Sequence, residues 1–79
     1  GMYKEYAPKD KNFYVYERCH EGKRLLVIGC FASEFTRFNA PEGITLGDWT
    51  LELSNYDGCF VIGNGFTARP YELRVYSKG

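Results

Sequence analysis

Apolar and polar positions alternate along most of this chain, in short runs that turn-forming residues separate. Residues 13–18 (FYVYER) alternate in this way, and residues 25–31 (LLVIGCF) are apolar almost throughout. The first pattern is typical of a strand with one buried face, and the second of a central strand covered on both faces. Because a short loop containing Gly22 separates the two runs, the sequence predicts an antiparallel hairpin.

Further short strands are predicted after the hairpin, over residues 35–38, 49–54, 59–62 and 69–76. In the run 49–54, three large apolar side chains share one face and are predicted to enter the core: Trp49, Leu51 and Leu53.

The last run, 69–76, begins near Pro70, which has no N–H to donate and therefore belongs at a strand start or edge. Leu73 and Val75 share one face of this strand. The opposite face, which carries Glu72, Arg74 and Tyr76, is predicted to meet solvent.

No window has sustained helical periodicity, so the spacing of six or seven short strands predicts an all-β fold. We expect a small antiparallel Greek-key β-sandwich, with residues 1–79 forming a single domain. Gly1 before Met2 resembles a remnant of tag removal and is set aside from fold reasoning.

Composition narrows the possible functions. The ten basic and ten acidic residues cancel, whereas nucleic-acid binders usually carry a basic surplus, so no nucleic-acid partner is predicted. No apolar stretch is long enough to span a membrane, and no signal peptide is visible. Three widely spaced cysteines, an odd number, favour free thiols in a cytoplasmic protein.

The candidate chemical groups do not form a recognisable site. The single His20 cannot complete a zinc site with Cys19, Cys30 and Cys59, and neighbours in a strand point to opposite faces, which argues against a Cys19–His20 dyad. The loop 63–65 is followed by no helix that could hold a phosphate. The carboxylates are predicted to lie in turns or on solvent faces: Glu42, Asp48, Glu52, Asp57 and Glu72. We therefore predict no catalytic residue, no metal and no cofactor.

Four segments carry a family resemblance: residues 13–18, 23–31 (KRLLVIGCF), 53–56 (LSNY) and 69–76 (RPYELRVY). In this order they resemble the C-terminal β-domain of glycoside hydrolase family 13, the α-amylase family, in its α-glucosidases, oligo-1,6-glucosidases and trehalose-6-phosphate hydrolases. Cys30 and Leu73 differ from the Asn and Ala that are usual there.

The resemblance implies a non-catalytic domain that packs against a catalytic (β/α) barrel and stabilises it. The parent enzyme would hydrolyse α-glucosidic bonds in oligosaccharides. The alternative is a freestanding carbohydrate-binding β-sandwich, whose platform would come from the aromatic side chains Trp49, Tyr14, Tyr16 and Tyr56.

The two aromatic-rich runs, 13–18 and 71–76, carry rings on both faces, more than one small core can hold. The sequence therefore predicts a domain-docking or glycan surface formed by four tyrosines: Tyr14, Tyr16, Tyr71 and Tyr76. A free domain is expected to cover such a surface by self-association, as a symmetric dimer.

Overall fold

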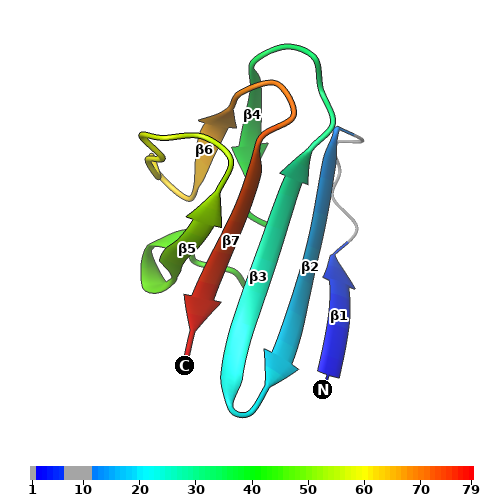
Figure 1. Cartoon of the computed structure of the whole chain (residues 1–79), viewed down its shortest axis with the longest axis vertical. Helices are drawn as coiled ribbons and strands as arrows, with labels where there is room; N and C mark the ends of the chain where they lie inside the picture. Colours follow the sequence, from blue (N-terminus) through cyan, green and yellow to red (C-terminus); the bar gives the residue numbers. More distant parts are fainter. Residues whose placement is uncertain (1, 7–11) are drawn as a thin grey trace.

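The computed structural model describes residues 2–6 and 12–79; Gly1, the suspected tag remnant, lies outside them. In this part of the chain the strands are β1 (Met2–Tyr6), β2 (Phe13–His20), β3 (Lys23–Cys30), β4 (Thr36–Asn39), β5 (Thr50–Ser54), β6 (Gly65–Ala68) and β7 (Leu73–Lys78). A single 3-10 turn, η1 (Leu46–Asp48), precedes β5. The all-β prediction is confirmed (Figure 1).

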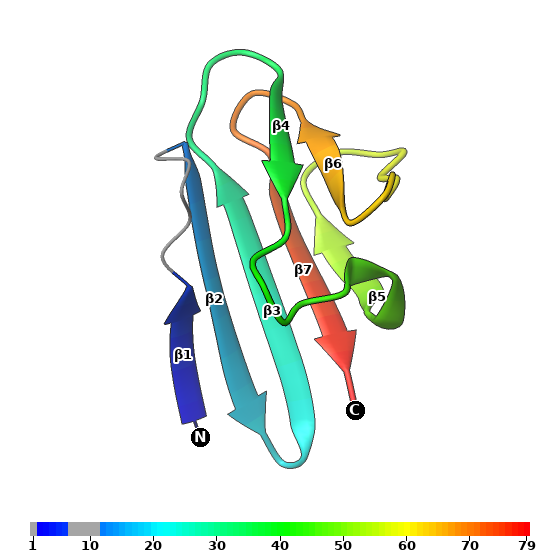
Figure 2. The same cartoon turned by 180° about the vertical axis from the view of Figure 1, so that it is seen from behind.

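Two antiparallel sheets form two layers. The larger has the strand order β1-β2-β3-β7-β5, and the smaller consists of β4 and β6. Figure 2 shows the smaller sheet lying over one face of the larger. After β3 the chain passes from one sheet to the other at every connection, as in Greek-key sandwiches.

The β2–β3 hairpin is confirmed and forms the centre of the large sheet. Its strands pair from Phe13↔Cys30 to His20↔Lys23. Glu21 and Gly22 form the turn with φ of 51° and 79°. Two successive positive φ values are those of a type I′ turn, whose twist matches the flanking strands.

The core lies between the two sheets and is rich in aromatic rings. Phe38 packs against Phe13 at 4.9 Å and against Phe66 at 5.1 Å between ring centroids. Within the small sheet, β6 approaches β4 very closely at Gly65, where an added Cβ would lie 2.0 Å from the carbonyl oxygen of Phe38. Only glycine fits there.

Strands β1 and β6 have no counterpart among the predicted strands, and two predicted strands differ from those observed. Residues 59–62 form an irregular loop with one isolated bridge, Ile62↔Gly65. The closing strand begins only at Leu73, because residues 69–72 form a turn.

In the region of β5, Trp49 is buried as predicted, but Leu51 and Leu53 are 39% and 62% exposed. A register irregularity between these two leucines, on a strand at the sheet edge, breaks the expected alternation.

Candidate docking surface

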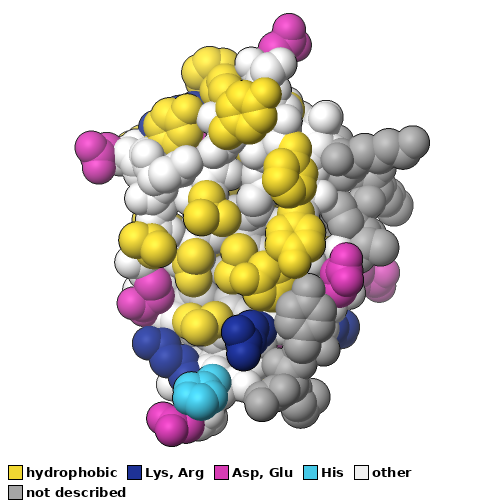
Figure 3. All heavy atoms as spheres, turned by 45° about the vertical axis from the view of Figure 1, so that its right-hand side comes forward, with side chains coloured by type: hydrophobic (Ala, Val, Ile, Leu, Met, Phe, Trp, Pro, Cys, Tyr) yellow, Lys and Arg dark blue, Asp and Glu magenta, His cyan; other side chains and the backbone are white. Residues whose placement is uncertain are grey.

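The side of the large sheet that faces away from β4 and β6 is apolar. We call this side the outer face. Among the described side chains, seven larger apolar ones lie on it: Tyr14, Tyr16, Leu25, Val27, Leu53, Leu73 and Val75. Strand register aligns four of them across four strands, because Tyr16 pairs with Val27, Val27 with Val75, and Val75 with Leu53. Figure 3 shows hydrophobic side chains gathered over this face.

A second row runs beside the first, from Tyr14 through Gly29 to Leu73. An added Cβ at Gly29 would touch the Leu73 side chain at 3.8 Å and the Tyr14 Cβ at 4.0 Å, so these two side chains flank the glycine. The Tyr14 ring lies 5.1 Å from the Tyr16 ring and 6.3 Å from the ring of Phe31, which is 62% exposed. The aromatic surface therefore continues past the end of β3.

The four tyrosines of the predicted surface fall into different places. Tyr14 and Tyr16 lie together on the outer face, and Tyr71 is exposed in the turn before β7. The placement of Tyr76 on this surface is wrong: it is 3% exposed, and its hydroxyl oxygen accepts a hydrogen bond from Arg74 Nη1 (2.9 Å). Burial raises the pKa of the Tyr76 hydroxyl, against the effect of Arg74.

The sequence prediction of this surface named only tyrosines and missed its aliphatic side chains, such as Val27 and Val75. Val27 lies in the run 25–31, whose continuous apolar character predicted a strand covered on both faces. The described structure covers this strand only on the side of β4 and β6. Counting the apolar side chains left on the other side of that run would have revealed the surface.

Glu72, predicted to face solvent, is buried at 2% exposure between two arginines. Arg69 Nε donates to Glu72 Oε1 (3.1 Å), and Arg74 Nε donates to Glu72 Oε2 (2.6 Å). The Arg69 amide also donates to Glu72 Oε1 (2.8 Å). Burial by itself would raise the pKa of Glu72, but the bonds from Arg69 and Arg74 outweigh it and lower the pKa to about 2.

The same two arginines hold the loop between β5 and β6. Arg69 Nη1 donates to the carbonyl of Asp57 (2.6 Å), and Arg74 Nη1 donates to that of Phe60 (3.0 Å). Arg74 also stacks over the Phe66 ring, 3.6 Å from its centroid. The buried ion-pair network therefore fixes the loop, the turn before β7 and one wall of the core together.

A second carboxylate cluster joins β1 to the hairpin. Glu17 accepts hydrogen bonds from the Tyr6 hydroxyl (2.8 Å) and from Arg24 Nε (2.6 Å). The bond from Arg24 is the main cause of the lowered pKa of Glu17, and burial together with Glu17 raises the pKa of Tyr6 to about 12. Tyr6 thus fastens the edge strand to the sheet.

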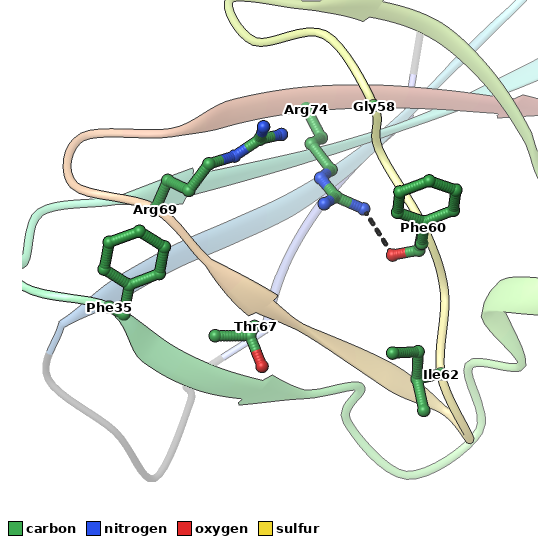
Figure 4. Close-up of a pocket in the computed structure, with 7 residues that line it drawn as sticks. All are labelled: Phe35, Gly58, Phe60, Ile62, Thr67, Arg69 and Arg74. Atoms are coloured by element: carbon green, nitrogen blue, oxygen red, sulfur yellow. Dashed lines mark hydrogen bonds between the residues drawn. The ribbon is translucent and has the colours of Figure 1, made fainter.

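The loop between β5 and β6 borders a hollow of about 220 Å³. Figure 4 shows Phe35 and Phe60 at opposite sides of it, with Thr67 below and the guanidinium groups of Arg69 and Arg74 above. Phe35 and Phe60 are 70% and 71% exposed. The hollow is therefore a second apolar surface, formed by loop side chains. Arg69 and Arg74 fix the backbone of the loop between β5 and β6 that carries Phe60.

The remaining candidate groups lie apart. The four other carboxylates of the sequence prediction are exposed: Glu42, Asp48, Glu52 and Asp57. No group of three or more His, Cys, Asp or Glu side chains in residues 2–6 and 12–79 is placed to hold a metal ion. The cysteines are free thiols, buried at Cys30 and half-buried at Cys19 and Cys59, as predicted. Within the same residues, no helix is long and apolar enough to cross a membrane.

The geometry defines a small antiparallel β-sandwich with one bare apolar sheet face, the form expected of one part of a larger protein. Sequence comparison agrees. The chain is 38% identical over 80 residues to the oligo-1,6-glucosidase of Halalkalibacterium halodurans and 32% identical to that of Bacillus cereus, in each case over 96% of this chain and 14% of the relative. No family model matches the chain.

Solved structures give the same result. The trehalose-6-phosphate hydrolase of Bacillus licheniformis superposes with a TM-score of 0.76 at 29% identity, over 98% of this chain and 14% of that enzyme. The trehalulose synthase of Pseudomonas mesoacidophila MX-45 shares the fold, with a TM-score of 0.74 at 22% identity. These matches confirm the resemblance to a domain-sized part of α-glucosidase-type enzymes.

Proposed function

We propose that residues 1–79 form the C-terminal, non-catalytic domain of a family 13 α-glucosidase, and that the outer face packs against the catalytic (β/α) barrel. The relatives named for glucosidase activity are about seven times longer than the matched segment, since it covers 14% of each. The rest of each relative is therefore long enough to supply a domain that covers the outer face.

The observation that carries the proposal is that the outer face is apolar although the domain already buries a core on the other side of the same sheet. Val15, Leu26 and Ile28 are at most 1% exposed on the inner side of the hairpin, so the domain already has its own core. A (β/α) barrel is surrounded by helices. An apolar sheet face therefore fits such a helical layer, as in other α/β packing.

The proposal assigns no acid or base of this chain to hydrolysis, and no cofactor or metal. Glu17 and Glu72 each bind arginines, so these carboxylates support the fold. Three free thiols, without a disulfide, support a reducing cytoplasmic compartment. The parent reaction would be hydrolysis of α-glucosidic bonds by carboxylates of the barrel.

The first test concerns Val27, at the centre of the outer face. The reading frame should continue upstream of Met2 and encode a barrel. In that full-length enzyme, Val27→Lys should lower the temperature of thermal inactivation by several degrees, because it places an unpaired charge in the interface. In the isolated chain, where Val27 is half-buried on a sheet face that no other described element covers, the same change should lower the free energy of unfolding by only about 1 kcal/mol, the average for point substitutions.

Thr45→Lys is the matched control, because Thr45 is exposed and its side chain makes no cap hydrogen bond; it should leave the full-length enzyme unchanged. The isolated chain should self-associate through the outer face across a hundredfold concentration range in sedimentation, and Val27→Lys should make it monomeric. A frame that ends near Met2, or equal effects of both lysines on the full-length enzyme, would contradict the proposal.

A specific observation favours a second candidate, carbohydrate binding at the hollow between Phe35 and Phe60. Exposed aromatic rings can stack on the apolar faces of a sugar, and Thr67 offers a hydroxyl group nearby. Two members of the earlier candidate platform are not available for such stacking, because Trp49 is buried and Tyr56 is stacked under Arg69 at 4.4 Å. The other two, Tyr14 and Tyr16, lie on the outer face.

If the hollow binds sugar, isomaltose or maltose should shift the NMR signals of residues 58–62. Phe60→Ala should abolish these shifts and change the free energy of unfolding by about 0.5 kcal/mol or less, since the ring is exposed. Phe31→Ala, an exposed ring elsewhere, should leave binding intact. Unchanged spectra at high sugar concentration would eliminate this candidate.

A further inference from the structure

Tyr71 has a backbone conformation that favours glycine. Its φ is 54°, and it lies in a turn closed by a hydrogen bond from the Glu72 amide to the Arg69 carbonyl (3.1 Å). Proline at the second position and a positive φ at the third define a type II turn, which normally has Gly or Asn at the third position. A side chain with a Cβ is strained there.

The surrounding structure holds this strained turn from several sides. Asn55 Nδ2 donates to the Tyr71 carbonyl (2.9 Å), and the Leu73 amide donates to Asn55 Oδ1 (2.8 Å). The Tyr71 amide donates to the carbonyl of Ala32 (3.2 Å), and the buried Glu72 carboxylate fixes Arg69. Strain that is maintained in this way is a recurrent feature of binding sites.

Within this chain the Tyr71 ring contributes little burial, because it is 62% exposed. Glu21 also has a positive φ, at 51°, but the tight hairpin turn requires it there. Tyr71 differs, since glycine would satisfy its turn with less strain. The turn lies beside the aromatic end of the outer face, because the Tyr71 amide binds the carbonyl of Ala32, the residue after the exposed Phe31, whose ring lies 6.3 Å from that of Tyr14.

We infer that Tyr71 is the anchor of the docking interface, a preformed aromatic side chain that enters a pocket on the partner. The inference rests on the proposed function, and the partner is the barrel domain of the same enzyme. The receiving pocket has apolar walls for the ring and a hydrogen-bond partner for the hydroxyl group. Buried tyrosines are common interface hot spots, and a rigidly held one loses little conformational freedom on docking.

The test compares Tyr71→Gly in two settings. In the isolated chain the melting temperature should stay the same or rise by a few degrees, because the strain is relieved and little contact is lost. In the full-length enzyme the temperature of thermal inactivation should fall by several degrees. Tyr71→Phe should give a smaller fall, which measures the hydroxyl group separately.

Comparison with Val27→Lys separates the proposed docking of the outer face from the inferred role of Tyr71 as its anchor. If Val27→Lys weakens the full-length enzyme and Tyr71→Gly does not, the outer face docks but Tyr71 is not its anchor. If neither substitution affects the full-length enzyme, the proposed function itself fails. A lower melting temperature for Tyr71→Gly in the isolated chain would show a structural role for the ring and overturn the inference.

Discussion

Replacement of Glu72 by glutamine is expected to lower the free energy of unfolding by about 3–5 kcal/mol, the usual cost of removing one partner of a buried ion pair. The substitution keeps the size of the side chain but leaves Arg74, whose side chain is 3% exposed, without its carboxylate. It also weakens the hold of Arg69 on the loop carbonyl of Asp57. Urea unfolding at pH 7, followed by tryptophan fluorescence, measures the loss.

Glu42→Gln is the matched control, because Glu42 is an exposed loop carboxylate. It should change the free energy of unfolding by about 0.5 kcal/mol or less. Small domains have a total stability of only about 5–15 kcal/mol, so Glu72→Gln will remove a large share of it. A loss below about 1 kcal/mol would mean that the network contributes little to stability.

The same carboxylate gives stability a defined pH dependence. The pKa of Glu72 is about 2 in the folded chain, against an ordinary value of 4.5. A pKa lowered by folding contributes stability above the unfolded value, and this contribution is lost as the pH falls from about 4.5 toward 2. Unfolding measured between pH 2 and pH 7 should show a steeper loss of stability in acid for the unsubstituted chain than for Glu72→Gln, in which Glu17 still has a lowered pKa.

The alternation of apolar and polar positions predicted the hairpin correctly, because in β2 every second side chain enters the core. Phe13 and Val15 are buried, and Tyr14 between them is exposed. In β7 the rule fails, since Arg74 and Tyr76 point inward and Leu73 outward. An arginine enters this core because Glu72 neutralises it and Phe66 provides a ring for its flat face. That pairing spans different elements, so periodicity within one strand cannot predict it.

The candidate surface was predictable only in part, for a related reason. Tyr14 and Tyr16 stood out as aromatic residues at alternate positions, but their neighbours Val27 and Val75 meet them only through strand register. The hollow could not be predicted at all. It depends on an irregular loop whose carbonyls at Asp57 and Phe60 are held by arginines from distant positions.

Replacement of Trp49 by alanine is expected to lower the free energy of unfolding by about 3–5 kcal/mol, as for other large buried aromatic side chains. Trp49 is 8% exposed, and Arg24 and Lys78 lie over its ring at 5.0 Å and 5.9 Å from the centroid. Trp49 follows η1 directly, and Arg24 and Lys78 belong to β3 and β7. The Trp49 side chain therefore attaches the end of η1 to the large sheet. Thermal melts followed by far-UV circular dichroism measure the loss, because the substitution removes the only tryptophan.

Phe35→Ala provides the comparison, since Phe35 is also a large aromatic residue but is 70% exposed; it should shift the melting temperature little. A glucan pull-down on both variants then separates a scaffold from a sugar-binding platform. If Trp49 belongs to the core, Trp49→Ala destabilises the chain, and any glucan binding at the hollow depends on Phe35 instead. A Trp49→Ala chain that keeps its stability but loses glucan binding would contradict this placement of the ring and favour the carbohydrate-binding alternative.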